Sequence, residues 1–192
     1  AQSSVIEEGE ARLRGFYAIS KLADQWLAEG YAQGFGLKTV GLRYFNVYGP
    51  RQDYRRTLPP IMSKFIITLL KGELPVLYEG DDLNKRDFVY VDDVNDFHVL
   101  CLEDERVASG VFRIGSGRNY SIEEVYRTIT ALLGATPAPV YKPRMPGDPP
   151  VATLADVSEA KKLGWFPKTS LEDGLRAMIA YIKEEMRKGN IR

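Results

Sequence analysis

The chain has 192 residues, of which 44% are hydrophobic, so it is long enough to bury a sizeable core as one domain or slightly more. Its 26 Lys and Arg residues balance its 26 Asp and Glu residues, which argues against nucleic acid or an anionic membrane as the partner. No apolar run is long enough to span a membrane and no signal peptide opens the chain, which predicts a cytoplasmic protein. The single cysteine, Cys101, excludes an internal disulfide bond and lies in an apolar stretch typical of a buried structural thiol.

Hydrophobic periodicity and turn residues predict helices and strands in alternation after a polar, exposed lead-in over residues 1–15. The first helix is expected over 17–33, with an apolar face that includes Trp26 and Leu27, and Gly34 ends it. The other expected helices are 58–71, 91–103, 121–133, 155–163 and 170–187. The expected strands are 37–45, 75–78, 86–90 and 111–114, with a further short one at 140–141.

Local signals fix several boundaries of these elements. The first long strand is expected to break at Asn46, and prolines are expected in the first turn of the 58–71 helix. Ser121 and Glu124 form a capping-box pattern, and Ser170 is expected to cap the last helix. A helix followed directly by a buried strand is half of a parallel α/β unit, so the fold class is α/β.

The first helix carries a candidate acid/base pair. Tyr17 and Lys21 stand four residues apart, so they share one helix face with Cβ atoms roughly 6 Å apart. A phenol has a pKa near 10, and a neighbouring ammonium favours the phenolate, so the pair can move protons. A Tyr-x-x-x-Lys match also arises by chance in a chain with 11 tyrosines, so the pattern alone leaves an ordinary helix-face pair open.

Further polar candidates follow the predicted strands. Asn46 can donate to and accept from a hydroxyl-rich ligand at a strand end, although asparagine before a turn is often only a turn residue. Arg86 and Arg144 carry the planar guanidinium that suits phosphate, although a surface arginine is solvated by default. The adjacent Asp92 and Asp93 are expected to cap the helix that they open, and we expect no metal site.

A dinucleotide-binding fold needs a glycine-rich turn directly after its first strand, so that backbone N–H groups can meet the pyrophosphate. The glycines at 30, 34 and 36 come before a strand, and those at 115 and 117 lack a third glycine at the start of the next helix. The pattern therefore argues against dinucleotide binding by this chain alone.

The motifs, taken together and in order, resemble the extended short-chain dehydrogenase/reductase family, in particular its NAD-dependent nucleotide-sugar epimerases and dehydratases. The resemblance covers residues 16–185 and matches the C-terminal part of such an enzyme. The segments that carry it are Tyr17-Ala-Ile-Ser-Lys21, Leu42-Arg-Tyr-Phe-Asn-Val-Tyr-Gly-Pro-Arg51, Arg86-Asp-Phe-Val-Tyr-Val-Asp-Asp-Val94, Ile114-Gly-Ser-Gly117 and Arg144-Met-Pro-Gly-Asp148.

The resemblance implies a role for each matching position. Tyr17 would accept the proton of the sugar hydroxyl, and Lys21 would bind the nicotinamide ribose of NAD and lower the pKa of Tyr17. Tyr44 and Phe45 would contact the cofactor. The substrate, a UDP-sugar, would contact Asn46, Arg86, Arg144 and Asp148, with the two arginines on its diphosphate. Hydride would pass to NAD and return to the other face of the sugar, as in a UDP-glucose 4-epimerase.

The resemblance also implies a domain plan. Residues 16–57 would end a Rossmann-type domain, and 58–192 would form mainly a small α/β substrate-binding domain, with 88–117 returning to the Rossmann sheet. Family members pair the helix that carries this tyrosine, which implies a homodimer. The glycine fingerprint and the Ser/Thr partner of the tyrosine have no counterpart here, so we expect the chain to be inactive alone.

One related class is disfavoured, in favour of a hexose or uronic-acid 4-epimerase of the UDP-glucose type, and two alternatives stay open. ADP-heptose epimerases resemble residues 43–51 and 78–94 but have a catalytic lysine where this chain has Arg55, and a guanidinium cannot serve as a base. A nucleotide-sugar 4,6-dehydratase is the enzyme runner-up. A non-catalytic sugar-nucleotide-binding or dimerisation module is the alternative from a different class, and it would bind UDP-sugar without reducing NAD.

Overall fold

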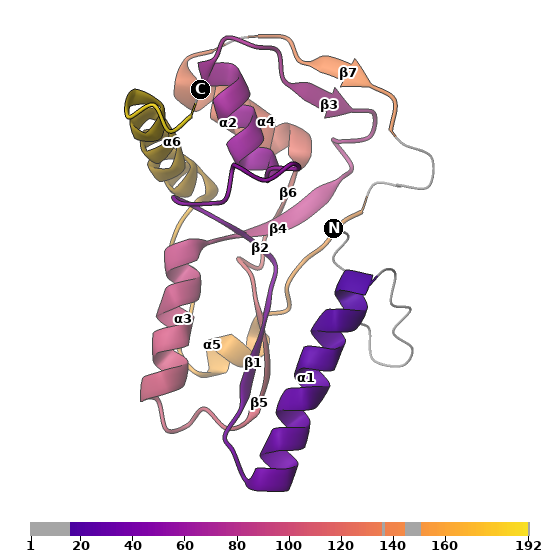
Figure 1. Ribbon diagram of the computed structural model, residues 1–192, viewed down its shortest axis with the longest axis vertical. Coiled ribbons are helices and arrows are strands. Elements are labelled where there is room, and N and C mark those ends of the chain that lie inside the picture. Colours follow the sequence, from indigo (N-terminus) through magenta and orange to yellow (C-terminus); the bar gives the residue numbers. More distant parts are fainter. Residues whose placement is uncertain (1–15, 136, 145–150, 192) are drawn as a thin grey trace.

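The computed structural model describes residues 16–135, 137–144 and 151–191 (Figure 1). The expected lead-in over 1–15 and Asp148 lie outside these ranges. The helices are α1 (Phe16–Phe35), α2 (Ile61–Leu70), α3 (Val91–Glu103), α4 (Ile122–Leu133), α5 (Ser158–Lys162) and α6 (Leu171–Arg187). The strands are β1 (Val40–Tyr44), β2 (Asn46–Tyr48), β3 (Val76–Tyr78), β4 (Lys85–Tyr90), β5 (Gly110–Ile114), β6 (Asn119–Ser121) and β7 (Val140–Lys142).

Parallel strand pairs dominate the architecture and confirm the α/β class. β1 pairs with β5 in parallel, with Val40 opposite Gly110, and β3 pairs with β7 in parallel. β4 lies between β2 and β6, parallel to the first and antiparallel to the second. Because β2 follows β1 after a single residue, the chain passes directly from one sheet to the next.

Two hydrophobic cores lie at the two ends of the elongated molecule (Figure 1). The upper core joins α2, α4 and α6, and in it Phe65 packs edge-on against Tyr126 with ring centroids 5.6 Å apart. The lower core joins α3, β5 and α5, and in it Phe97 packs edge-on against Trp165 with centroids 5.5 Å apart. No helix within the described ranges is long and apolar enough to cross a bilayer.

Several elements differ from the sequence prediction. The strand expected from residue 37 begins at Val40, and the helix expected over 155–163 spans only Ser158–Lys162. The first long strand ends at Tyr44 as a partner of β5, but a second strand begins at Asn46 and pairs with β4, so Asn46 starts a strand instead of ending one. β6 was not expected, because three residues are too short for a periodic pattern. α2 begins at Ile61, since Pro60 has extended backbone angles (φ −56°, ψ 143°) and forms its N-cap.

The predicted helix caps have mixed outcomes. The Ser121 capping box is confirmed: Glu124 N donates to Ser121 Oγ over 3.0 Å, and Ser121 N donates to Glu124 Oε2 over 2.6 Å. Ser170 caps α6 by accepting from Asp173 N over 3.1 Å. The expected capping of α3 by its paired aspartates is wrong, because the N-cap is Tyr90 and the buried Asp93 carboxylate accepts instead from the backbone of Lys168 and Thr169.

Candidate active site

The first two turns of α1 present Tyr17 and Lys21 on one face. The Lys21 ammonium lies 5.9 Å from the centroid of the Tyr17 ring, and the Tyr17 side chain is 62% exposed. Asp24 forms an ion pair with Lys21 over 2.8 Å, and the hydrogen bond in this pair raises the pKa of Lys21. The lysine is therefore a fixed positive charge beside an accessible phenol, which is the arrangement that the four-residue spacing predicts.

Tyr44 and Phe45 lie at the carboxyl end of β1. The Tyr44 hydroxyl lies 2.8 Å from His98 Nε2, and His98 Nδ1 lies 2.9 Å from the Val94 carbonyl oxygen. Because a carbonyl only accepts, Nδ1 of His98 donates to Val94 O, which fixes the ring with Nε2 facing the Tyr44 hydroxyl. Burial raises the pKa of Tyr44. Phe45 donates its N–H to Ile114 O over 2.9 Å, and its ring packs against the lower core.

Asn46 and Arg86 come together where β2 begins beside β4. Asn46 Nδ2 donates to the backbone oxygen of Asp87 over 2.8 Å, which places it next to the residue that follows Arg86. Arg86 Nη1 donates to its neighbour Lys85 O over 3.1 Å and also to Val151 O. Asn46 therefore contacts the strand that carries Arg86, although the two residues stand 40 positions apart in the sequence.

Arg144 is held by a buried carboxylate. Its Nη2 donates to Asp81 Oδ1 over 2.5 Å and its Nε donates to Glu79 O over 3.1 Å. Asp81 is fixed in turn, because Tyr78 N donates to its other oxygen over 2.8 Å. The guanidinium therefore sits on the turn between β3 and β4, so a phosphate would have to share it with Asp81.

Two carboxylates that organise this region, Asp81 and Asp87, were missed at the sequence level. Both are buried, and Asp87 is completely shielded from solvent. The available signal was a charged residue inside an otherwise apolar strand, Asp87-Phe88-Val89-Tyr90, since a buried charge requires hydrogen-bond donors around it. Within the described residues, no group of three His, Cys, Asp or Glu side chains could hold a metal ion.

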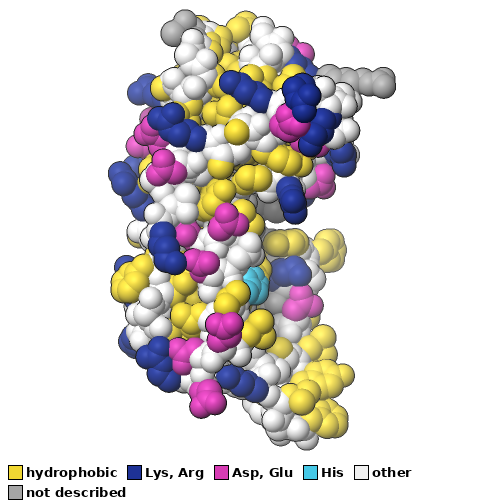
Figure 2. Space-filling view, turned by 90° about the vertical axis from the view of Figure 1, so that its left-hand side faces the viewer, with side chains coloured by type: hydrophobic (Ala, Val, Ile, Leu, Met, Phe, Trp, Pro, Cys, Tyr) yellow, Lys and Arg dark blue, Asp and Glu magenta, His cyan; other side chains and the backbone are white. Residues whose placement is uncertain are grey.

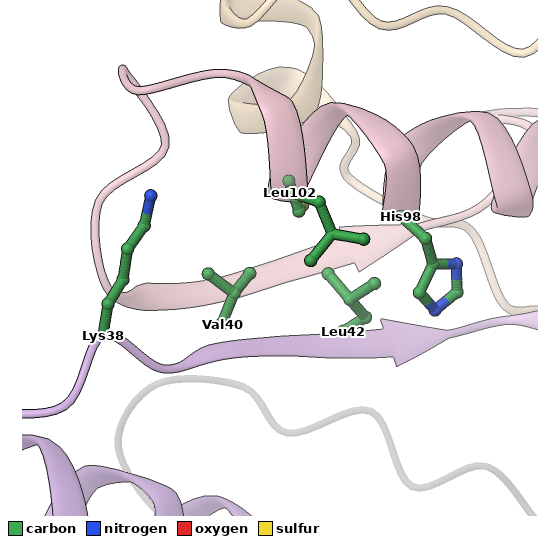
Figure 3. Close-up of a pocket in the computed structure, with 6 residues that line it drawn as sticks. Lys38, Val40, Leu42, His98 and Leu102 are labelled. Carbon is green, nitrogen blue, oxygen red and sulfur yellow. The ribbon is translucent and has the colours of Figure 1, made fainter.

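A hollow of about 420 Å³ lies between β1 and α3 (Figure 3). Val40 and Leu42 reach into it from β1, and Leu102 and His98 reach into it from α3. The half-buried Cys101 also lines it. Burial raises the pKa of its thiol, so the thiol is not activated as a nucleophile. None of the predicted site residues lines this hollow.

The described residues therefore provide three polar groupings. They are the Tyr17–Lys21 pair on α1, the region where β2 meets β4 with Asn46 on one strand and Arg86 on the other, and Arg144 on Asp81. Figure 1 shows that the N-terminal end of α1 is the end nearer to β2 and β4. Acidic and basic side chains are interspersed over the face in Figure 2, so no patch of one sign covers it.

Comparison with known proteins gives a consistent answer. The family model described as the NAD dependent epimerase/dehydratase family matches residues 1–115. A putative UDP-glucose 4-epimerase from Methanocaldococcus jannaschii is 30% identical over 171 residues, which are 89% of this chain and 54% of that protein. The chain thus spans about half the length of the curated relatives that it matches.

Solved structures agree with this match. The UDP-glucose 4-epimerase of Thermotoga maritima, solved with UDP-glucose, has a TM-score of 0.81 and 37% identity, over 88% of this chain and 54% of that one. The UDP-glucose 4-epimerase of Thermus thermophilus, solved with NAD, has a TM-score of 0.78 and 32% identity, over 93% and 59% of the two chains. With a Rossmann-type α/β fold and a family match over more than half of its residues, the chain belongs to the NAD dependent epimerase/dehydratase family.

Proposed function

We propose that this chain forms part of an enzyme that epimerises a UDP-hexose at C4 with the help of NAD. The observation that carries the proposal is the accessible Tyr17 phenol with the Lys21 ammonium on the same helix face, 5.9 Å from the ring centroid. A base for a sugar hydroxyl must be open to the ligand, and Tyr17 meets this requirement.

The described residues fit part of a nicotinamide site. Lys21 has an exposed ammonium next to the proposed base, and of its three N–H donors one goes to Asp24 and the others can reach ribose hydroxyls. Tyr44 and Phe45 stand at the carboxyl end of a parallel strand, where ligands of open α/β sheets bind. Bound NAD would supply the hydride acceptor and donor of the reaction.

Within this proposal, Tyr17 accepts the proton of the C4 hydroxyl and later returns it. Asn46 orients a sugar hydroxyl through its side-chain amide, and Arg86 and Arg144 bind the diphosphate, with Asp148 near the nucleoside ribose. Support comes from the hydrogen bond of Asn46 Nδ2 to the backbone oxygen of Asp87, the residue that follows Arg86. The division into a Rossmann part over 16–57 and a mainly substrate-binding part over 58–192 belongs to the same proposal.

The family description covers dehydratases as well as epimerases, so a nucleotide-sugar 4,6-dehydratase is the second candidate. Both reactions begin by oxidising the same sugar carbon, and the groups described here serve that step. The two are separated by product: an epimerase returns UDP-glucose and UDP-galactose, whereas a dehydratase releases a 4-keto-6-deoxy sugar.

The test is Tyr17→Phe in the full-length protein, with UDP-glucose as substrate. Turnover should fall by about 10²–10⁴-fold, because the proton acceptor is lost, while affinity for UDP changes little. Tyr31→Phe, which removes a hydroxyl from another exposed tyrosine of α1, is the matched control and should keep normal turnover. Lys21→Met should lower both the rate and the amount of NAD retained. Near-normal turnover in Tyr17→Phe would contradict the proposal.

A further inference from the structure

A buried carboxylate joins three distant segments next to the proposed substrate residues. Asp87 is 0% exposed, and its Oδ1 accepts from Ser116 N over 2.7 Å. Its Oδ2 accepts from Gly117 N and from Ala155 N, each over 3.0 Å. The Ser116 hydroxyl also donates to Oδ1, over 2.7 Å. Both carboxylate oxygens are thus used by groups that lie 29 to 68 residues away in the sequence.

The packing around this carboxylate leaves no spare room. A Cβ atom added to Gly115 would lie 2.8 Å from Asp87 Oδ2 and 2.3 Å from Ala155 Cβ. Real Cβ atoms do not approach other atoms so closely, so any larger residue at 115 would displace Ala155 or the carboxylate. Glycine is needed here for the close approach of three segments.

The segment that ends at Ala155 runs along β4. Thr153 N donates to Lys85 O over 3.0 Å, and Val151 N donates to Asn84 Oδ1 over 3.4 Å. The Arg86 guanidinium donates to Val151 O, and this hydrogen bond ties the arginine side chain to the segment. Asp87 is therefore the buried anchor of the segment on which the Arg86 side chain rests. Its backbone oxygen also holds the Asn46 amide.

We propose that Asp87 is a positioning residue for the nucleotide: it sets the place of Arg86 through segment 151–155, holds Asn46 through its own backbone oxygen, and never touches the ligand. The inference rests on the proposed function, since it assumes that Arg86 binds the diphosphate. The negative charge matters, because each oxygen faces at least one backbone N–H. In Asp87→Asn, an amide nitrogen therefore opposes a donor in either orientation.

The test compares UDP binding by calorimetry in four variants of the full-length protein. Asp87→Asn perturbs the anchor chemically, and Gly115→Ala perturbs it sterically. Asp93→Asn is the matched control, since Asp93 is also a buried carboxylate that accepts two backbone N–H groups, but its donors are Lys168 and Thr169 and not the segment 151–155. Arg86→Ala reports on the diphosphate site itself. Ser116→Ala, which removes only one hydroxyl, serves as a milder fifth variant should the first two fail to fold.

We expect Asp87→Asn and Gly115→Ala to raise the Kd for UDP about tenfold, in keeping with one misplaced charge-assisted contact. The KM for UDP-glucose should rise by the same factor while kcat changes less than twofold. Asp93→Asn should lower the melting temperature comparably and leave the Kd unchanged. Ser116→Ala should raise the Kd by a smaller factor.

Other outcomes separate this inference from the proposed function. An unchanged Kd in the Asp87, Gly115 and Ser116 variants, together with lost binding in Arg86→Ala, would overturn the positioning role and leave the diphosphate site standing. An equal rise in Asp93→Asn would also overturn it, because the effect would then be general destabilisation. If the unaltered protein binds no UDP, both the inference and the proposed function fail.

Discussion

At the scale of single residues, the Arg144–Asp81 pair combines a structural role with the proposed ligand role. Both side chains are largely buried, at 14% and 6% exposure, and their atoms are 2.5 Å apart. Removing one member of such a pair leaves an uncompensated charge, which costs far more than the intact pair contributes. The effect of an Arg144 substitution on stability must therefore be measured before its effect on ligand binding is interpreted.

We predict that Arg144→Ala lowers the free energy of unfolding by roughly 3 kcal/mol, because the Asp81 carboxylate loses its counter-charge. Adding Asp81→Asn should recover part of the loss, since the amide oxygen can still accept from Tyr78 N. Urea unfolding of the single and double variants measures both effects. A double variant less stable than Arg144→Ala would show that the ion pair does not account for the loss.

A second residue-scale prediction concerns pH. Arg106 donates to both carboxylate oxygens of Asp104, and these hydrogen bonds lower the pKa of Asp104 from 3.8 to about 2. A lowered carboxyl pKa contributes stability that is present above the unfolded value and is lost as pH falls from about 4 to about 2. Arg106→Gln should therefore return the pKa of Asp104 toward 3.8 in an NMR titration. Arg127→Gln, which breaks an exposed pair elsewhere, should leave it unchanged.

Which site residues could be predicted from sequence depends on the range of their contacts. The shared face of Tyr17 and Lys21 follows from helix geometry alone, because the pair is local. The hold of Asp87 on Ser116 and Ala155 depends on tertiary packing, which no local pattern encodes. Helix spacing therefore predicts the Tyr17–Lys21 pair and cannot predict the hydrogen bonds that Asp87 accepts.

At the scale of elements, the amphipathic helices were predictable, and among the three-residue strands β3 and β7 were predicted whereas β2 and β6 were not. The helices α3, α4 and α6 begin within a residue of their expected starts, since capping residues and acidic first turns mark them. The three-residue strands β2 and β6 exist because β4 lies between them and supplies hydrogen-bond partners on both sides. Their own sequences carry too few positions for a period of two to be visible.

The contact between α6 and β2 gives an element-scale prediction. Gly174 of α6 faces Tyr48 of β2 so closely that an added Cβ would lie 2.3 Å from the tyrosine hydroxyl and 2.7 Å from its ring. Gly174→Ala should therefore cost about 1–3 kcal/mol of stability, because Tyr48 is buried and cannot move aside. Gly30→Ala in α1 is the matched control: nothing lies within 4 Å of its Cβ, so alanine should be neutral or stabilise by up to about 1 kcal/mol. Thermal unfolding measures both, and equal effects would contradict this account of the contact.

At the scale of the whole molecule, the two cores explain why family motifs far apart in sequence matter together. The upper core holds α2, α4 and α6, and the lower core holds α3, β5 and α5. β4 contributes to both, through Phe88 and Val89 respectively. Asn46, Arg86 and Asp87 lie on or beside this shared strand. The sequence motifs could identify these residues, but the arrangement of the two cores around β4 requires the tertiary structure.

The last prediction concerns the apolar face of α1, which is the proposed homodimer contact. Trp26 and Leu27 are 62% and 63% exposed, and Tyr31 stacks on Phe35 with centroids 5.5 Å apart, so the uncovered face extends along the helix. Exposed apolar surface of this extent favours burial against another molecule. We therefore expect the 192-residue chain to self-associate in sedimentation velocity runs, and the double variant Trp26→Glu, Leu27→Glu to shift it toward monomer. Leu102→Glu on α3 is the control, since Leu102 is 87% exposed but lies on another helix. A monomer at high concentration, or an equal shift in the control, would show that α1 is not the contact.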